Sequence, residues 1–126
     1  MKSIQPEFYL SPLQVKEYHL KGALIIDVRE AFEFADKGID LPNVFNFPLS
    51  TLKENHKQIP EKKTLIVVCT VGFCSDKAAK ILLNNGFKQV FILQGGLLNW
   101  SDEGLAMYTN PENIPDDITP HQCNCS

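Results

Sequence analysis

Short apolar segments alternate along the chain with segments in which apolar residues recur at helical spacing. The apolar segments predict strands at residues 8–10, 23–28, 44–46, 64–68 and 90–93. The intervening segments predict helices at residues 12–20, 29–37, 50–56 and 75–85, and a last helix after residues 95–96. Strands that are apolar throughout and separated by helices are typical of a parallel sheet covered on both faces. The pattern therefore predicts an α/β fold with a central, mostly parallel sheet and helices on both faces.

Two serines are expected to begin helices. Ser11 is followed by Pro12, a pairing typical of an N-cap and the first helical position. Ser50 precedes the short helix that is expected to run toward His56.

Three segments with candidate chemistry lie at the carboxyl ends of predicted strands, at residues 27–29, 69–74 and 94–96. In open parallel sheets the functional crevice lies beyond the carboxyl ends of the strands. We therefore expect these segments to converge on one side of the molecule.

Composition narrows the functional classes. A chain of 126 residues with 44% hydrophobic content has the size of one domain, and a net charge of −3 gives no support to a nucleic-acid partner. No apolar run approaches the roughly 18–20 residues of a membrane helix, and the first residues lack a signal-peptide core. We expect a cytoplasmic protein without a membrane partner. Its domain should span residues 1–108, and an extended polar tail should occupy residues 109–126.

Cys69 has the position most typical of a reactive thiol. It follows the apolar strand at residues 64–68 and precedes a short loop and a helix. Such a turn directs backbone N–H groups to one point beside the positive end of a helix, where a nucleophilic thiolate is favoured. The alternative is a small buried apolar side chain at a strand end, which is common for free cysteines.

Four segments resemble those of single-domain rhodaneses, sulfurtransferases of the rhodanese-like superfamily. They occur in the family's order and are residues 25–30 with 33–34, 41–49, 67–75 and 95–100. The resemblance implies a three-layer rhodanese-like fold and a sulfurtransferase without a cofactor. It also implies that Cys69 takes sulfane sulfur from a small donor and becomes a persulfide. The acceptor would then be a thiol, a cyanide-like molecule or a protein.

By the same resemblance, the active-site loop comprises Thr70, Val71, Gly72, Phe73, Cys74 and Ser75. Backbone N–H groups of such a loop can cap a persulfide anion without a cationic side chain, and Gly72 suits a backbone that must curl. Many family members have arginine where this chain has Cys74, and residues 70–75 carry no charge. Because thiosulfate is a dianion, we expect weak activity with it.

Cys74 has two interpretations. It is either a resolving thiol, which forms a disulfide with an oxidised Cys69, or a small residue where the loop meets the helix. The first interpretation supports an alternative function, in which the domain senses oxidants through Cys69 and Cys74. A non-catalytic module that binds a partner is a further alternative.

Residues around the loop are expected to support it. Asp27 and Arg29 are interpreted as an ion pair that fixes the junction of strand and helix, or as groups that contact substrate. Trp100 is expected in the core. Gly95 and Gly96 should permit a close approach of backbone to the loop.

The expected tail contains His121, Cys123 and Cys125. These are soft metal ligands, but a closed zinc site has four ligands. We therefore expect no metal site. The two cysteines are interpreted as incidental thiols or as acceptors of sulfur from Cys69.

Overall fold

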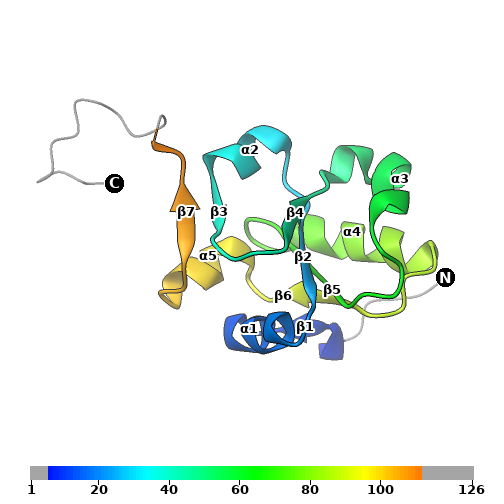
Figure 1. The fold of residues 1–126 in the computed structure, drawn as a ribbon, viewed down its shortest axis with the longest axis horizontal. Helices are drawn as coiled ribbons and strands as arrows, with labels where there is room; N and C mark the ends of the chain where they lie inside the picture. The colour runs from blue at the N-terminus through cyan, green and yellow to red at the C-terminus, as the bar shows by residue number, and fades with distance from the viewer. Residues whose placement is uncertain (1–5, 112–126) are drawn as a thin grey trace, which may run out of the picture.

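A sheet of five parallel strands forms the centre of the molecule (Figure 1). The computed structural model describes residues 6–111. The strands lie in the order β1-β6-β5-β2-β4. They are β1 (Tyr9–Leu10), β2 (Leu24–Asp27), β4 (Val44–Asn46), β5 (Leu65–Val68) and β6 (Val90–Leu93). The predicted α/β fold with a mostly parallel sheet is confirmed.

Helical segments connect the strands. They are η1 (Pro6–Phe8), α1 (Pro12–Leu20), α2 (Ala31–Asp36), η2 (Leu49–Thr51), α3 (Leu52–Asn55), η3 (His56–Gln58), α4 (Phe73–Asn84) and α5 (Gly96–Asp102), the η segments being 3₁₀ helices. No helix of residues 6–111 combines the length and apolar character needed to cross a membrane.

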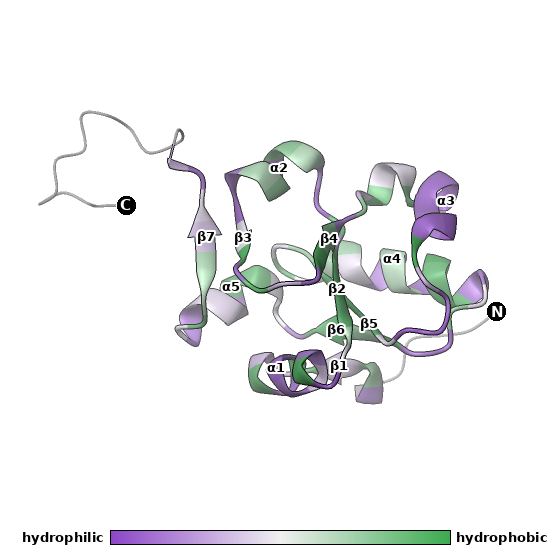
Figure 2. Ribbon diagram, in the orientation of Figure 1, coloured by the Kyte–Doolittle hydropathy of each residue, from purple (hydrophilic) through white to green (hydrophobic). Residues whose placement is uncertain are grey.

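The sheet separates two hydrophobic cores, because successive residues of a strand point to opposite faces. Ile25 and Ile66 pack on one side with residues of α1 and α5, including the fully buried Trp100. Ile26 and Val67 pack on the other side with residues of α3 and α4. Figure 2 shows the hydrophobic residues concentrated on these central strands. Helices therefore cover both faces, and the core position predicted for Trp100 is confirmed.

The helix starts follow the sequence in part. Ser11 caps α1 as predicted, and its hydroxyl accepts the N–H of Gln14 while the Gln14 side chain accepts the N–H of Ser11. The cap predicted for Ser50 is wrong. This residue lies inside η2, and its hydroxyl donates to Glu30 instead.

Two predicted helix boundaries are also wrong. Helix α4 begins at Phe73, two residues before the predicted start, because Gly72 has a φ of 112° and turns the chain directly into the helix. Helix α2 spans only Ala31–Asp36, since Lys37 has extended backbone and begins a further strand.

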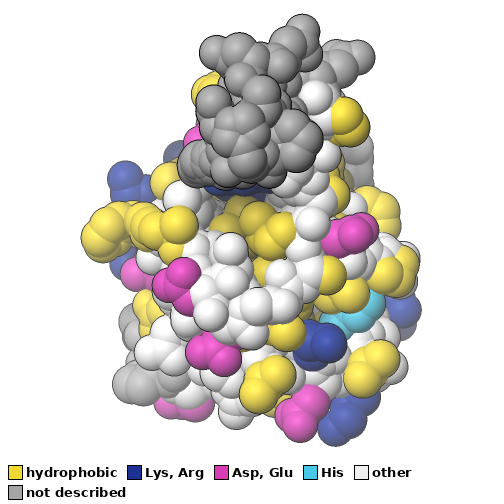
Figure 3. All heavy atoms as spheres, turned by 90° about the vertical axis from the view of Figure 1, so that its left-hand side faces the viewer, with side chains coloured by type: hydrophobic (Ala, Val, Ile, Leu, Met, Phe, Trp, Pro, Cys, Tyr) yellow, Lys and Arg dark blue, Asp and Glu magenta, His cyan; other side chains and the backbone are white. Residues whose placement is uncertain are grey.

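That further strand, β3 (Lys37–Ile39), pairs antiparallel with β7 (Met107–Thr109). Neither strand was predicted. The pairing places Thr109 opposite Lys37, and the N–H of Asn110 donates to the carbonyl of Asp36 at 2.7 Å. The expected boundary after residue 108 therefore falls inside a strand. Figure 3 views the molecule from the side of β7 and α5, where hydrophobic side chains reach the surface among charges of both signs.

Candidate active site

Cys69 lies at the carboxyl end of β5, where the chain leaves the sheet. Its side chain is almost fully buried, at 3% exposure. The Sγ atom accepts a hydrogen bond from the backbone N–H of Gly72 at 3.0 Å. Gly72 has a left-handed backbone, which turns the chain into α4 directly after this contact.

Helix α5 supports the loop from one side. The N–H of Leu97 donates to the carbonyl of Cys69 at 2.8 Å, and the N–H of Leu98 donates to the carbonyl of Thr70 at 3.1 Å. The approach is so close that a Cβ on Gly96 would lie 2.4 Å from the oxygen of Thr70. The close approach expected at Gly96 is therefore confirmed. Since a trans peptide directs its N–H opposite to its carbonyl, the N–H groups of Thr70 and Val71 point away from α5.

The start of α4 completes the surroundings of the sulfur. Phe73, Cys74 and Ser75 form its first turn, where backbone N–H groups have no partner within the helix and the dipole favours negative charge. Cys74 is exposed. Ser75 is fully buried, and its hydroxyl has no hydrogen-bond partner within residues 6–111.

A cleft of about 380 Å³ opens over Cys69. It is lined by Val28, Arg29, Glu30, Glu33, Leu49, Ser50, Cys69, Thr70, Val71, Phe73 and Cys74. Two of the three segments expected to converge therefore meet here. Gln94 and Gly95 of the third segment line a separate cavity of about 280 Å³, on the other side of Gly72 and Phe73.

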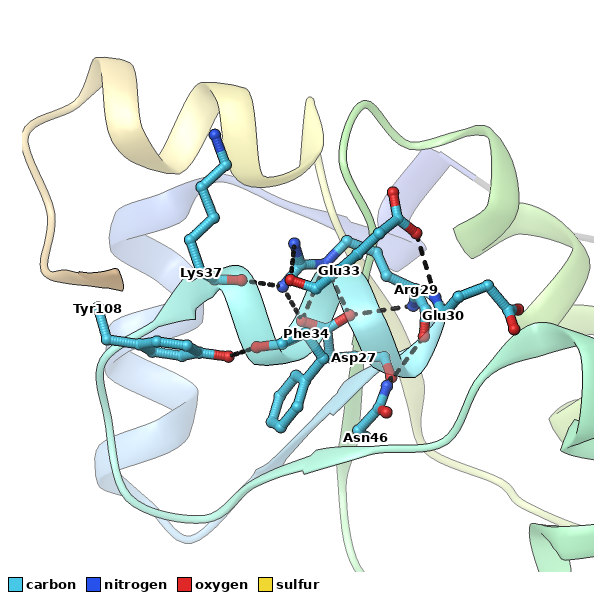
Figure 4. A network of polar contacts seen from close by, with 8 residues as sticks. All are labelled: Asp27, Arg29, Glu30, Glu33, Phe34, Lys37, Asn46 and Tyr108. Carbon is cyan, nitrogen blue, oxygen red and sulfur yellow. Dashed lines mark hydrogen bonds and ion pairs between the residues drawn. The ribbon is translucent and has the colours of Figure 1, made fainter. Parts of the chain in front are cut away.

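Asp27 and Arg29 form a buried ion pair beside the cleft (Figure 4). Nη2 of Arg29 lies 2.7 Å from Oδ2 of Asp27, and Nε donates to both carboxylate oxygens at 3.0 and 3.2 Å. The guanidinium also donates to the carbonyls of Glu33 and Lys37. Burial would lower the pKa of Arg29, but the hydrogen bonds and charge of Asp27 raise it. The ion pair is present, and it joins β2 to α2 and β3.

Two residues in this network were not predicted. The amide of Asn46 donates to the carbonyls of Asp27 and Arg29 at 3.0 and 2.9 Å, and the Tyr108 hydroxyl donates to the carbonyl of Phe34. Burial, with the negative charge of Asp27, raises the pKa of Tyr108 while Arg29 opposes the shift. Tyr108 lies in a strand that no local pattern predicted.

Glu30 and Glu33 were also not assigned to the site by sequence. Both are half-buried and line the cleft. Glu33 Oε1 accepts the backbone N–H of Glu30 at 3.1 Å, and Glu30 Oε1 accepts the hydroxyl of Ser50 at 3.0 Å. The spacing of these glutamates at the start of a helix was the available sequence signal.

The tail residues His121, Cys123 and Cys125 lie outside the described residues. Among residues 6–111, no three histidine, cysteine, aspartate or glutamate side chains are grouped so that they would hold a metal ion.

The model of the rhodanese-like domain family matches residues 11–103 of this chain. The chain belongs to this family. The match includes Cys69, its loop, the residues that line the cleft and the Asp27–Arg29 pair.

Individual relatives and a solved structure are similar to this chain over more than half of its length. An uncharacterized protein of Synechocystis sp., slr1261, is 31% identical over 92% of this chain and 64% of its own length. A sulfurtransferase of Allochromatium vinosum is 28% identical over 68% of this chain and 78% of its own length. The crystal structure of a rhodanese-related protein from Thermoplasma volcanium superposes with a TM-score of 0.71 at 28% identity, over 79% of this chain and 96% of the other.

This rhodanese-like domain thus has a relative named as a sulfurtransferase. The chain spans less than two thirds of the length of several curated relatives, including slr1261.

Proposed function

We propose that this rhodanese-like domain transfers sulfane sulfur through a persulfide on Cys69. The observation that carries the proposal is the placement of the Cys69 sulfur. It lies beneath a cleft that Phe73 and Cys74 of α4 also line, and it accepts the N–H of Gly72, the N-cap residue of that helix. An anion in this position is stabilised by backbone dipoles alone.

The chemistry requires one nucleophile and no redox partner. The Cys69 thiolate attacks the outer sulfur of a donor persulfide, a new S–S bond forms, and the donor S–S bond breaks to release the donor thiolate. The outer sulfur keeps its oxidation level. In the second half, an acceptor thiolate or cyanide attacks the outer sulfur, and the Cys69 thiolate leaves.

Asp27 and Arg29 act in this proposal as positioning residues. The guanidinium nitrogens of Arg29 donate to Asp27 and to the carbonyl of Lys37, which are groups of the protein itself. Asp27 therefore compensates the positive charge of Arg29. The pair holds the junction between β2 and α2, which forms the wall of the cleft opposite the loop. We also propose that the protein acts in the cytoplasm, where thiols are kept reduced.

Turnover with a persulfide donor and cyanide tests the function. Thiocyanate should form with the wild-type domain and with Glu61→Gln, a surface variant near the other end of β5. With Cys69→Ser it should form only at the rate of the uncatalysed reaction between donor and cyanide, measured without protein. If Cys69→Ser retained the wild-type rate, the proposed role of Cys69 would be wrong. A wild-type domain that is inactive with all sulfur donors would favour the alternative of a non-catalytic binding module.

A further inference from the structure

The charged residues in the cleft restrict the charge of the molecules that can exchange sulfur with Cys69. Of the eleven residues that line the cleft, three are charged: Arg29, Glu30 and Glu33. Arg29 is only 6% exposed and pairs with Asp27, and its charge also acts on Glu33. Two glutamates against one largely buried arginine leave the lining with a net negative charge. Lys77 of α4 is exposed and does not line the cleft. The carboxylates of Glu30 and Glu33 oppose the entry of sulfur anions such as thiosulfate, although backbone N–H groups favour an anion on Cys69 itself.

The surface around the nucleophile is apolar. Phe73 is 80% exposed and Val71 is 45% exposed, and both line the same cleft as Cys69. Exposed phenylalanine is unusual on a surface that faces only water and small ions, whereas aromatic side chains are enriched where proteins meet.

From these two features, and resting on the proposed function, we infer that the partner of Cys69 is a protein segment. The segment carries a thiol or persulfide between basic residues. Its lysines or arginines would pair with Glu30 and Glu33, and its apolar neighbours would contact Val71 and Phe73. Charge complementarity of this kind raises association rates and rejects partners of the wrong sign.

Matched peptide persulfides test this inference. Two peptides of equal length each carry one cysteine persulfide, flanked by lysines in one and by glutamates in the other. The rate of sulfur loading on Cys69 is followed by intact mass. We expect the lysine peptide to load about tenfold faster or more at low salt, and the difference to shrink at high salt because the charges are screened.

The variant Glu30→Gln/Glu33→Gln removes both charges and keeps the oxygen atoms that accept hydrogen bonds from Ser50 and from the backbone. It should abolish the preference for the lysine peptide. Glu61→Gln makes the same chemical change near the amino end of β5, far from the cleft, and should keep the preference. Circular dichroism confirms that each variant is folded.

Two small donors complete the test. Thiosulfate should load Cys69 slowly in the wild type and faster in Glu30→Gln/Glu33→Gln. Cysteamine persulfide, a small cationic donor, should load more slowly than the lysine peptide, and Phe73→Ser should narrow that difference.

Equal rates for the two peptides, or an unchanged ratio in the double variant, would overturn the inference. A cysteamine rate equal to that of the lysine peptide would overturn the assignment to a protein. Failure of all donors to load Cys69 would instead overturn the proposed function.

Discussion

Replacing Gly96 with alanine tests how α5 positions Cys69, the proposed nucleophile. The added Cβ would lie 2.4 Å from the carbonyl oxygen of Thr70 and 2.5 Å from that of Cys69. An ordinary carbon–oxygen contact is about 3.3 Å or longer, so the loop backbone must move by about 1 Å. Gly96 also has a φ of 65°. This left-handed conformation costs an L-residue about 1–2 kcal/mol.

Both stability and activity should therefore fall. Overpacking costs typically about 1–3 kcal/mol, and together with the backbone strain we expect a loss of about 2–5 kcal/mol in the free energy of unfolding. The displaced atoms include the backbone of the residue that carries the nucleophile. A displacement of about 1 Å lowers reaction rates by up to about 100-fold, and we expect a loss of that order in sulfur loading on Cys69.

Gly104→Ala is the matched control. Gly104 has a φ of 77°, and no atom lies within 4 Å of a Cβ added there. This variant should lose only about 1–2 kcal/mol and load sulfur at the wild-type rate. Urea denaturation measures stability, and a time course of intact mass with a persulfide donor measures loading. Wild-type loading in Gly96→Ala, or equal destabilisation of the two variants, would refute the positioning role of α5.

Asp27→Asn leaves the buried Arg29 unpaired and should cost about 3–5 kcal/mol in urea unfolding; a loss below about 1 kcal/mol would contradict the buried network. Cys74→Arg places a cation in the cleft and should raise thiosulfate:cyanide turnover about tenfold, since an ion pair near a surface contributes about 1–4 kcal/mol. An unchanged rate would show that charge does not limit this substrate. Mild peroxide should join Cys69 to Cys74 in a disulfide that reductants reverse, because both thiols line one cleft. A peptide map with over-oxidised Cys69 and free Cys74 would exclude that bond.

Elements with strong local signals were predicted well from the sequence. The signal for each of these elements lies within a few residues of the element itself. They are the apolar strands β2, β5 and β6 and the capped helix α1. The start of α4 was misplaced, because the left-handed φ of Gly72 decides it and most residues of the loop would also fit a helix. Strands β3 and β7 were missed for a different reason. Each has three residues, and they pair across a long stretch of chain that local patterns do not describe.

The position of Cys69 at the end of a strand was predictable from the sequence, whereas the residues that form the walls of the cleft were less so. The position of Cys69 and its loop could be inferred because an apolar strand ends directly before a turn that contains glycine. The acidic wall formed by Glu30 and Glu33 depends on the orientation of α2, which the contacts of Arg29 with Asp27, Glu33 and Lys37 determine. Some of those contacts are to backbone carbonyls, whose positions depend on the whole fold, so a local sequence pattern does not predict them.

The central claim is that sulfur resides on Cys69 during transfer. Intact mass and peptide mapping after incubation with a persulfide donor test it directly in wild type, Cys69→Ser and Cys74→Ser. We predict a gain of one sulfur atom in the wild type and in Cys74→Ser, located on the peptide that contains Cys69, and lost on addition of cyanide. The same gain in Cys69→Ser, or its location on Cys74 in the wild type, would contradict the account.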